Sequence, residues 1–335
     1  MSSSPHSSRL SHQNLIMQRR AVIGNADNFW LFSSRNGFDL THTEHGAKPG
    51  LNLKTTTSSV TLSPAKTALV IIDMQNFFLS EAFGRSKGPG HAAADSLVNN
   101  AIPAARKAGV RVVWLNWGLT DEDVKTMPPA VKRAFGFEAF ETVPASPFEE
   151  QPNGIAVDKF GDTRHLGGSV LLENGKDGRI YRGLGSPCGT VVMDSGKQVD
   201  AGRLLMRDTW NAALYPPLDE VYRQGSRLPS TPDVWIHKNR MSGMWGQSSP
   251  LEEFLEDQGI RTLLFAGVNT DQCVSGTLTD AFSKGYDCVL LGDGAGTTSP
   301  GFSQECIEYN AAKTWGFLSS TDEFARAVDE MGPRT

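Results

Sequence analysis

Cys273 lies at a position where a thiol could act as a nucleophile. It follows the buried-strand pattern of residues 262–266, and Val274, Leu278 and Phe282 after it have the spacing of a helix. The positive end of a helix dipole favours a thiolate, and the free backbone N–H groups there can bind an oxyanion. This cysteine could therefore attack a carbonyl carbon and stabilise the tetrahedral product.

Two further ionisable residues close predicted strands. Asp73 ends the apolar run 67–72, and Lys238 ends the run 233–237. An ammonium group beside a thiol favours the thiolate, while a carboxylate can accept the proton of the thiol. Because the carboxyl ends of parallel strands meet at one edge of a sheet, we expect Asp73, Lys238 and Cys273 to lie together.

The elements that must position these residues are strands alternating with helices through most of the chain. This pattern is typical of a parallel sheet covered on both faces, so we expect a three-layer α/β/α, Rossmann-like fold. The pattern predicts about six strands. They span residues 67–72, 110–115, 233–237, 262–268, 288–291 and 316–319.

The chain divides into three segments, the last of which carries an insertion. Residues 1–20 are Ser-rich, hold no acidic residue and are interpreted as a disordered leader, although an organellar targeting segment would share these features. Residues 21–60 contain two short strand patterns around an Asn-Gly turn and predict a hairpin arm. Residues 61–335 form the predicted main domain. Its long insertion, at about residues 118–230, has the length of a lid or interface segment. Within it, residues 171–181 and 190–199 each predict a hairpin around a Gly-containing turn.

Composition argues against several classes of protein. The 335 residues carry a formal net charge of −5 without a basic stripe, so the sequence does not predict nucleic-acid binding. The four cysteines and seven histidines show no metal-binding spacing, so we expect neither a metal site nor a disulfide framework. No apolar run approaches the roughly 20 residues that span a bilayer. We therefore expect a cytoplasmic protein that acts on a small molecule without a cofactor or a membrane partner.

Three motifs occur together in the order that one superfamily uses. They are Val70-Ile71-Ile72-Asp73-Met74-Gln75-Asn76, Lys238-Asn239-Arg240-Met241-Ser242-Gly243 and Gly267-Val268-Asn269-Thr270-Asp271-Gln272-Cys273-Val274. By these motifs the chain resembles the isochorismatase-like cysteine hydrolases, over about residues 64–325 without much of the insertion. Finer features in residues 114–118, 208–211 and 242–245 are most similar to the ureidoacrylate amidohydrolase branch.

The resemblance implies both a fold and a mechanism. The fold would be that of the isochorismatase-like hydrolases, with Asp73 as general base, Lys238 as the cation that organises the site and Cys273 as nucleophile. The backbone N–H groups of Asn269 and Cys273 would form the oxyanion hole, beside a cis peptide bond between Val268 and Asn269. The expected reaction is metal-independent cleavage of a C–N bond in a small ureido or amide compound, carbamoyl or ureidoacrylate-like, through a thioester acyl-enzyme.

Five side chains near predicted strand ends are candidates for binding the substrate. Asn116 could form hydrogen bonds with a ureido or amide group, and Arg240 could bind a carboxylate through two parallel hydrogen bonds. Trp117, Trp210 and Trp245 could wall the pocket, although aromatic residues are more often part of the core.

Three other functions stay open at this point. Isochorismatase-type vinyl-ether hydrolysis is disfavoured, because family members with that activity do not need the cysteine. A nicotinamidase-like amidase is disfavoured, because Asn116-Trp117-Gly118 stands where nicotinamidases carry a metal-binding Asp-x-His. A non-catalytic binding or scaffold protein would keep the fold without needing the complete set of Asp, Lys and Cys. Oligomers are common in the superfamily, and the resemblance implies a homo-oligomer.

Overall fold

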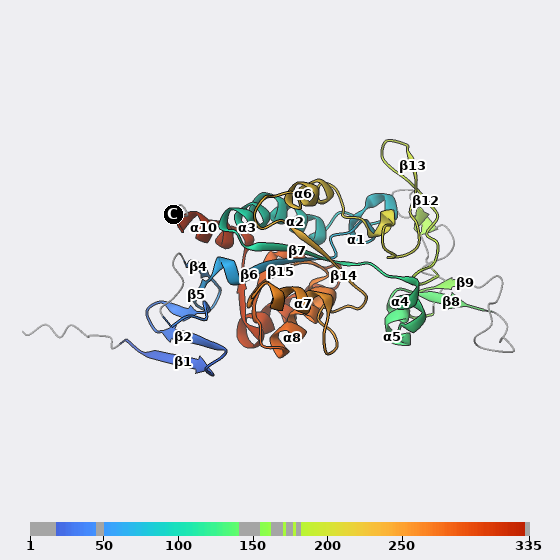
Figure 1. Cartoon of the computed structure of the whole chain (residues 1–335). Coiled ribbons are helices and arrows are strands. Elements are labelled where there is room, and N and C mark those ends of the chain that lie inside the picture. Colours follow the sequence, from blue (N-terminus) through green and yellow to red (C-terminus); the bar gives the residue numbers. More distant parts are fainter. Residues whose placement is uncertain are drawn as a thin grey trace, which may run out of the picture.

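Six parallel strands form the central sheet of the protein (Figure 1). The computed structural model describes residues 18–44, 50–140, 155–161, 170–171, 177–178 and 182–331. The strand order in the sheet is β14-β7-β6-β15-β16-β17. The strands are β6 (Thr67–Ile72), β7 (Arg111–Trp117), β14 (Val234–Lys238), β15 (Thr262–Val268), β16 (Asp287–Gly296) and β17 (Phe317–Ser319). Every neighbouring pair is parallel, which confirms the predicted α/β class.

Helices cover both faces of this sheet, so the three-layer α/β/α architecture is confirmed (Figure 1). One face carries α2 (Pro89–Ser96), α3 (Ile102–Ala108), α6 (Leu218–Gly225) and α10 (Thr321–Glu330). The opposite face carries α7 (Pro250–Asp257), α8 (Ser275–Ser283) and α9 (Gly301–Asn310). A short helix, α1 (Asn76–Leu79), directly follows β6.

The central strands are apolar along their whole length because both of their faces are buried. All six residues of β6 are buried. Val70 and Ile72 pack into the core on the side of α7 and α8, while Leu69 and Ile71 pack into the core on the other side. A strand between two cores needs no polar face, which explains why these segments do not alternate between polar and apolar residues.

A second sheet lies at the amino-terminal ends of the central strands, where Figure 1 shows it in blue. Its strand order is β1-β2-β3-β5-β4. The strands are β1 (Arg20–Gly24), β2 (Phe29–Ser33), β3 (Gly37–Asp39), β4 (Leu51–Lys54) and β5 (Ser59–Leu62). The antiparallel pair β2 and β3 is the hairpin predicted from the sequence. The structure adds the three strands β1, β4 and β5 to it, so this part of the chain is a five-stranded sheet and not a two-stranded arm. Residues 1–17 of the predicted leader lie outside the described residues.

Asp287, the first residue of β16, ties the amino-terminal sheet to the central one. Its buried carboxylate accepts hydrogen bonds from Trp30 Nε1 at 2.7 Å and from Thr262 Oγ1 at 2.8 Å. It also pairs with His42 Nε2 at 2.7 Å. Since Trp30 and His42 belong to the amino-terminal part and Thr262 begins β15, one carboxylate connects both sheets.

The amino-terminal part also contacts the outer edge of the central sheet. The backbone N–H of Thr56 donates to the carbonyl oxygen of Leu318 in β17 at 2.9 Å. Ser319 Oγ donates to the carbonyl oxygen of Lys54 at 2.7 Å. Strand β17 is the last strand of the sheet on this side, so these bonds cover an edge that would otherwise be open.

Apart from α6, the elements described in the insertion lie at the other end of the central sheet (Figure 1). They include α4 (Asp121–Thr126), α5 (Pro129–Ala134), β8 (Phe137–Ala139), β9 (Ile155–Val157), β10 (Val170–Leu171), β11 (Asp177–Gly178), β12 (Thr190–Val192) and β13 (Gln198–Asp200). The hairpin predicted over residues 190–199 is confirmed as the antiparallel pair β12 and β13. Strands β10 and β11 also pair, while the rest of the hairpin predicted over residues 171–181 lies outside the described residues. None of the helices described has both the length and the apolar surface to cross a membrane.

Candidate active site

Two of the three predicted catalytic residues form a buried ion pair at the carboxyl ends of the strands. Lys238 Nζ lies 2.9 Å from Asp73 Oδ2, and the two side chains are 1% and 0% exposed. Strand β7 separates β6 from β14 in the sheet, so the lysine side chain crosses the end of β7 to reach the carboxylate. The Nζ atom also donates to the carbonyl oxygen of Arg240 at 3.1 Å.

The Asp73 carboxylate is held where it can accept a proton. Its Oδ1 atom accepts a hydrogen bond from the backbone N–H of Trp117 at 3.1 Å, and the residue has a positive φ of 54°. Burial raises the pKa of Asp73 above its ordinary value, although the Lys238 ammonium and the hydrogen bonds from Cys273 and Trp117 act in the opposite direction. A carboxylate with a raised pKa is a stronger base than an exposed aspartate.

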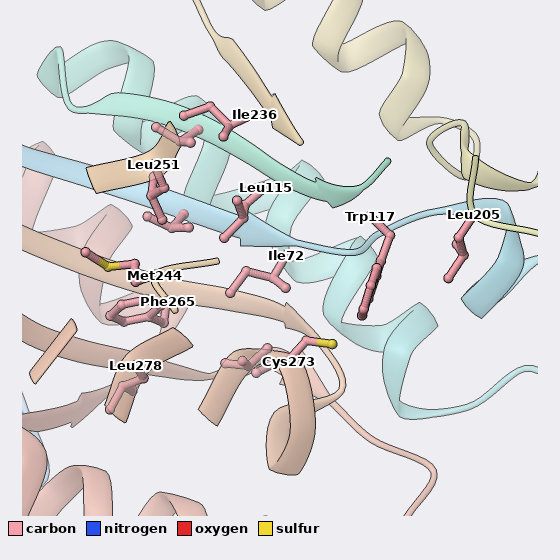
Figure 2. Close-up of a cluster of buried hydrophobic side chains, with 14 of the residues drawn as sticks. Ile72, Leu115, Trp117, Leu205, Ile236, Met244, Leu251, Phe265, Cys273 and Leu278 are labelled. Carbon is pink, nitrogen blue, oxygen red and sulfur yellow. The ribbon is translucent and has the colours of Figure 1, made fainter. Parts of the chain in front are cut away.

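Cys273 lies in the helical turn Thr270–Val274, which leads directly into α8. Its thiol interacts with the Asp73 carboxylate, and its Sγ atom lies 3.5 Å from Met241 Sδ. In Figure 2 the sulfur points away from Leu278 and toward the side of the sheet on which Trp117 lies. The thiol is therefore next to the base that would deprotonate it.

The protonation state of Cys273 differs from the sequence-based expectation. The sequence predicted that Lys238 and the helix dipole would favour a thiolate. Burial instead raises the pKa of Cys273 to about 12; the Lys238 ammonium lowers it, but the negative charge of Asp73 raises it further. Burial of the sulfur is the largest of these effects, and it favours the neutral thiol over the thiolate in the resting site.

Trp117 forms a wall between these residues and the far side of β7. It is fully buried, and Lys238 Nζ lies 4.1 Å from the centre of its ring. Gln75 fixes the backbone of Trp117: its Oε1 accepts from the Trp117 N–H at 3.1 Å, and its Nε2 donates to the Trp117 carbonyl oxygen at 2.8 Å. Gln75 was not among the predicted site residues, and its signal in the sequence was its place two residues after Asp73.

The turn before Cys273 has the backbone form that the family resemblance implies. The peptide bond between Val268 and Asn269 is cis. The carbonyl oxygen of Asn269 accepts hydrogen bonds from the N–H groups of Gln272 and Val274, at 3.0 and 3.2 Å. The carbonyl oxygen of Cys273 accepts from Thr277 Oγ1 at 2.7 Å, which fixes the start of α8.

The predicted substrate contacts do not form one group. Trp117 lies against Lys238, as described, and Arg240 stacks on Trp245 with its guanidinium carbon 4.5 Å from the ring centre. The Arg240 Nη1 atom donates to the carbonyl oxygen of Asn239 at 2.7 Å, and the Trp245 indole, on a residue that is 43% exposed, donates to Asn239 Oδ1 at 2.9 Å. These two residues therefore bind each other and Asn239 in the structure.

Asn116 and Trp210 are placed away from Cys273. Successive residues of a strand point to opposite faces of the sheet. Trp114 packs into the core on the α3 and α6 side, whereas Trp117 packs into the core that contains Cys273. Asn116 therefore shares the face of Trp114. Trp210 lies in the insertion, where its carbonyl oxygen accepts from Asn76 Nδ2 at 2.8 Å and its ring packs 5.9 Å from that of Phe83.

The segment Asn116-Trp117-Gly118 leaves no room for a side chain at Gly118. A Cβ added there would lie 2.0 Å from His237 Nδ1. Among the residues that the structure describes, no three His, Cys, Asp or Glu side chains form a group that could hold a metal ion.

The three-layer α/β/α fold brings Asp73, Lys238 and Cys273 together at the carboxyl ends of its parallel strands. A family model, the Isochorismatase domain, matches residues 67–162 and 190–322, so the chain belongs to the isochorismatase family of hydrolases.

Individual relatives agree with this assignment. The chain is similar to the ureidoacrylate amidohydrolase RutB of Klebsiella variicola (strain At-22), at 25% identity over 280 residues, 82% of this chain and 92% of the relative. It is also similar to RutB of Rhizobium rhizogenes (strain K84 / ATCC BAA-868), at 26% identity over 278 residues, 82% of this chain and 88% of the relative. A crystal structure of a cysteine hydrolase from Pseudomonas syringae pv. phaseolicola 1448A has the same fold. Its TM-score is 0.50 at 15% identity, and the match covers 84% of this chain and 98% of that one.

Proposed function

We propose that this protein is a metal-independent cysteine hydrolase that cleaves a C–N bond in a small ureido or amide compound, with carbamoyl or ureidoacrylate-like substrates favoured. The observation that carries the proposal is the buried pair of Lys238 and Asp73, 2.9 Å apart, beside the thiol of Cys273. The similarity to ureidoacrylate amidohydrolases supports the substrate class.

The first half of the reaction forms an acyl-enzyme. As Cys273 Sγ attacks the carbonyl carbon, its proton passes to Asp73, so a free thiolate never has to exist in the buried site. The carbonyl oxygen becomes an oxyanion, which the backbone N–H groups of Asn269 and Cys273 would stabilise. Collapse of the tetrahedral intermediate breaks the C–N bond. Asp73 returns its proton to the leaving nitrogen, and ammonia or an amine departs from a thioester on Cys273.

The second half of the reaction releases the acid. Asp73, again a carboxylate, takes a proton from a water molecule while the water oxygen bonds to the thioester carbon. The C–S bond then breaks, and Asp73 gives the proton back to the sulfur. Lys238 stays beside Asp73 throughout. Its positive charge offsets the cost of burying the Asp73 carboxylate whenever that group is ionised.

An ammonia-release assay with a panel of ureido and amide compounds, ureidoacrylate among them, tests this proposal. We expect activity toward at least one compound, loss of that activity in Cys273→Ala, and a covalent adduct on Cys273 in rapidly quenched samples by mass spectrometry. Cys306→Ala is the matched control, because Cys306 is an exposed free cysteine and should not matter.

Three results would contradict the proposal. One is full activity in Cys273→Ala. Another is hydrolysis of isochorismate without ammonia release from any amide, which would favour the vinyl-ether reaction. Inertness of the wild-type protein toward the whole panel and toward isochorismate would favour a binding or scaffold role.

A further inference from the structure

A cavity that is separate from the catalytic residues lies next to Trp117, on the face of the sheet that carries α6. Its volume is about 530 Å³. The residues around it that matter for its chemistry are Trp117, Arg207, Asp208, Tyr222, Trp235 and His237. The Asp73, Lys238 and Cys273 side chains do not line this cavity, and the proposed reaction does not use it.

Flat aromatic surfaces make up one wall of this cavity. Tyr222, on α6, packs edge-on against Trp235 with ring centres 5.2 Å apart, and against Trp114 with ring centres 6.0 Å apart. Stacked or edge-to-face aromatic neighbours favour a planar guest, because its ring or conjugated system can pack against the same surfaces.

His237 presents a hydrogen-bond donor. Its Nδ1 atom lies 3.2 Å from Trp235 Nε1, and an indole nitrogen can only donate, so Nδ1 must be the acceptor. The proton of the neutral ring is therefore on Nε2, for which the described residues supply no hydrogen-bond partner. Burial and the positive charge of Arg207 lower the pKa of His237, so the ring stays neutral and keeps this single donor.

Arg207 supplies a positive charge next to that donor. Its Nε atom donates to the carbonyl oxygen of Gly118 at 3.0 Å, which fixes the guanidinium group beside the cavity. The terminal guanidinium nitrogens make no hydrogen bond within the described part of the chain. Asp208, the next residue, has a positive φ of 60° and adds a negative charge at the same rim.

A buried amide beside His237 also lacks partners. Asn116 is fully buried, and neither its Oδ1 nor its Nδ2 has a hydrogen-bond partner among the described residues. It is directly in register with His237 on the neighbouring strand, so both side chains lie on the same face of the sheet. Buried polar groups without partners are rare in folded proteins, so the unsatisfied Asn116 amide marks a polar position next to His237, although Asn116 does not itself line the cavity.

We propose that this cavity binds a small monocarboxylate with a flat aromatic or conjugated body. The guanidinium of Arg207 and the Nε2–H of His237 would bind the carboxylate, and the rings of Tyr222 and Trp235 would pack against the planar body. Asp208 disfavours a second negative charge on the ligand. The site is separate from Asp73, Lys238 and Cys273, and Trp117, which lines it, also packs against Lys238.

Isothermal titration with benzoate as the probe tests the proposal. We expect benzoate to bind wild-type protein and Cys273→Ala with the same Kd. Benzyl alcohol, which lacks the charge, and phthalate, which carries a second one, should each bind at least about tenfold more weakly. In Arg207→Met and in Trp235→Leu, benzoate affinity should fall by at least about tenfold.

Arg223→Met is the matched control, because Arg223 is an exposed arginine of α6 that pairs with Glu220 and does not line the cavity. It should keep wild-type affinity. A thermal melt of each variant separates loss of binding from loss of folding, and Arg207 is exposed enough that its replacement should leave the melting temperature unchanged.

Three outcomes would overturn the proposal. The first is no binding of benzoate at about 10 mM. The second is wild-type affinity in Arg207→Met. The third is competitive inhibition of the hydrolase together with loss of benzoate binding once Cys273 is alkylated, which would put the probe in the catalytic pocket. The first two results are measured by binding alone and need no substrate, so the proposed function can fail independently.

Discussion

Asp73 must be ionised before it can accept the thiol proton, and this gives the reaction an acid limit. Burial raises the pKa of Asp73 above 3.8, so the fraction of active enzyme should fall as the pH decreases through a midpoint above that of an ordinary aspartate. We therefore expect kcat/KM to rise with pH through that midpoint when it is measured from about pH 4 to pH 8 with a substrate that does not titrate. An acid limb at or below about pH 4 would contradict it.

Lys238 is needed for the stability of the site as well as for its charge balance. Lys238→Met would leave the Asp73 carboxylate buried without its partner, which typically costs about 3–5 kcal/mol of unfolding free energy. Protonation of Asp73 would relieve part of that cost and remove the base, so activity at neutral pH should be lost.

Chemical denaturation and the ammonia assay together measure both effects. Lys107→Met is the matched control, because its pair with Asp329 is exposed, and it should change stability by less than about 1 kcal/mol. Equal changes in the two variants would show that the buried pair has no special role.

At the level of single residues, the sequence predicted which groups meet but not how their neighbours hold them. Asp73, Lys238 and Cys273 could be predicted because strand ends converge at one edge of a parallel sheet. The raised pKa of Cys273 could not be predicted, because it comes from burial, which depends on the whole tertiary structure. Asn116 and Trp117 could not both face the substrate, since they are consecutive in a strand, and the period-two rule already contained that information.

Gly267 of β15 lies close against the backbone of β6, just before the turn that carries Cys273. A Cβ at this position would lie 2.1 Å from the carbonyl oxygen of Ile72, and the residue has a φ of +112°. Gly267→Ala should therefore push the two strands apart and displace the catalytic turn. We expect a loss of about 1–3 kcal/mol of stability and a larger relative loss of kcat.

Gly259→Ala is the control that measures the cost of a positive φ alone, without a clash between strands. Gly259 also has a positive φ, of +64°, but nothing lies within 4 Å of an added Cβ. It should cost about 1–2 kcal/mol and leave kcat unchanged in the folded protein. If Gly267→Ala were as active as Gly259→Ala, the close approach of β6 and β15 would not matter for catalysis.

Among the elements, the central strands were the most predictable and the amino-terminal strands the least. A run such as residues 67–72 is apolar because two cores bury it, and that pattern is visible in the sequence. Strands β1, β4 and β5 are short and partly polar. They exist because β1 pairs with β2, β5 pairs with β3 and β4 pairs with β5, and because this sheet contacts the central one. Pairing between distant short segments leaves little local signal.

For the molecule as a whole, Asp287 is the main polar connection between the two sheets. Asp287→Asn would weaken the bonds from Trp30 and Thr262 and remove the ion pair with His42, at a cost of about 2 kcal/mol or more. Because Asp287 begins β16, whereas Cys273 follows the end of the adjacent strand β15, kcat should stay unchanged in folded protein.

Hydrogen exchange with mass spectrometry would locate this effect. Residues 20–62 should exchange faster in Asp287→Asn, while the strands β6 and β15 should keep their protection. Asp329→Asn is the control, since Asp329 is exposed. A uniform loss of protection over the whole protein would mean that the two sheets unfold as one unit.

The bond from Thr56 to Leu318 has a consequence for how the protein behaves at high concentration. An uncovered edge strand presents free N–H and carbonyl groups to the edge of any other sheet, including that of a second copy. Here the chain supplies its own covering for β17 from the amino-terminal sheet. Loosening that sheet, for example through Asp287, would therefore lead to aggregation before it impaired catalysis, and solubility would be lost while the chemistry of Cys273 was still intact.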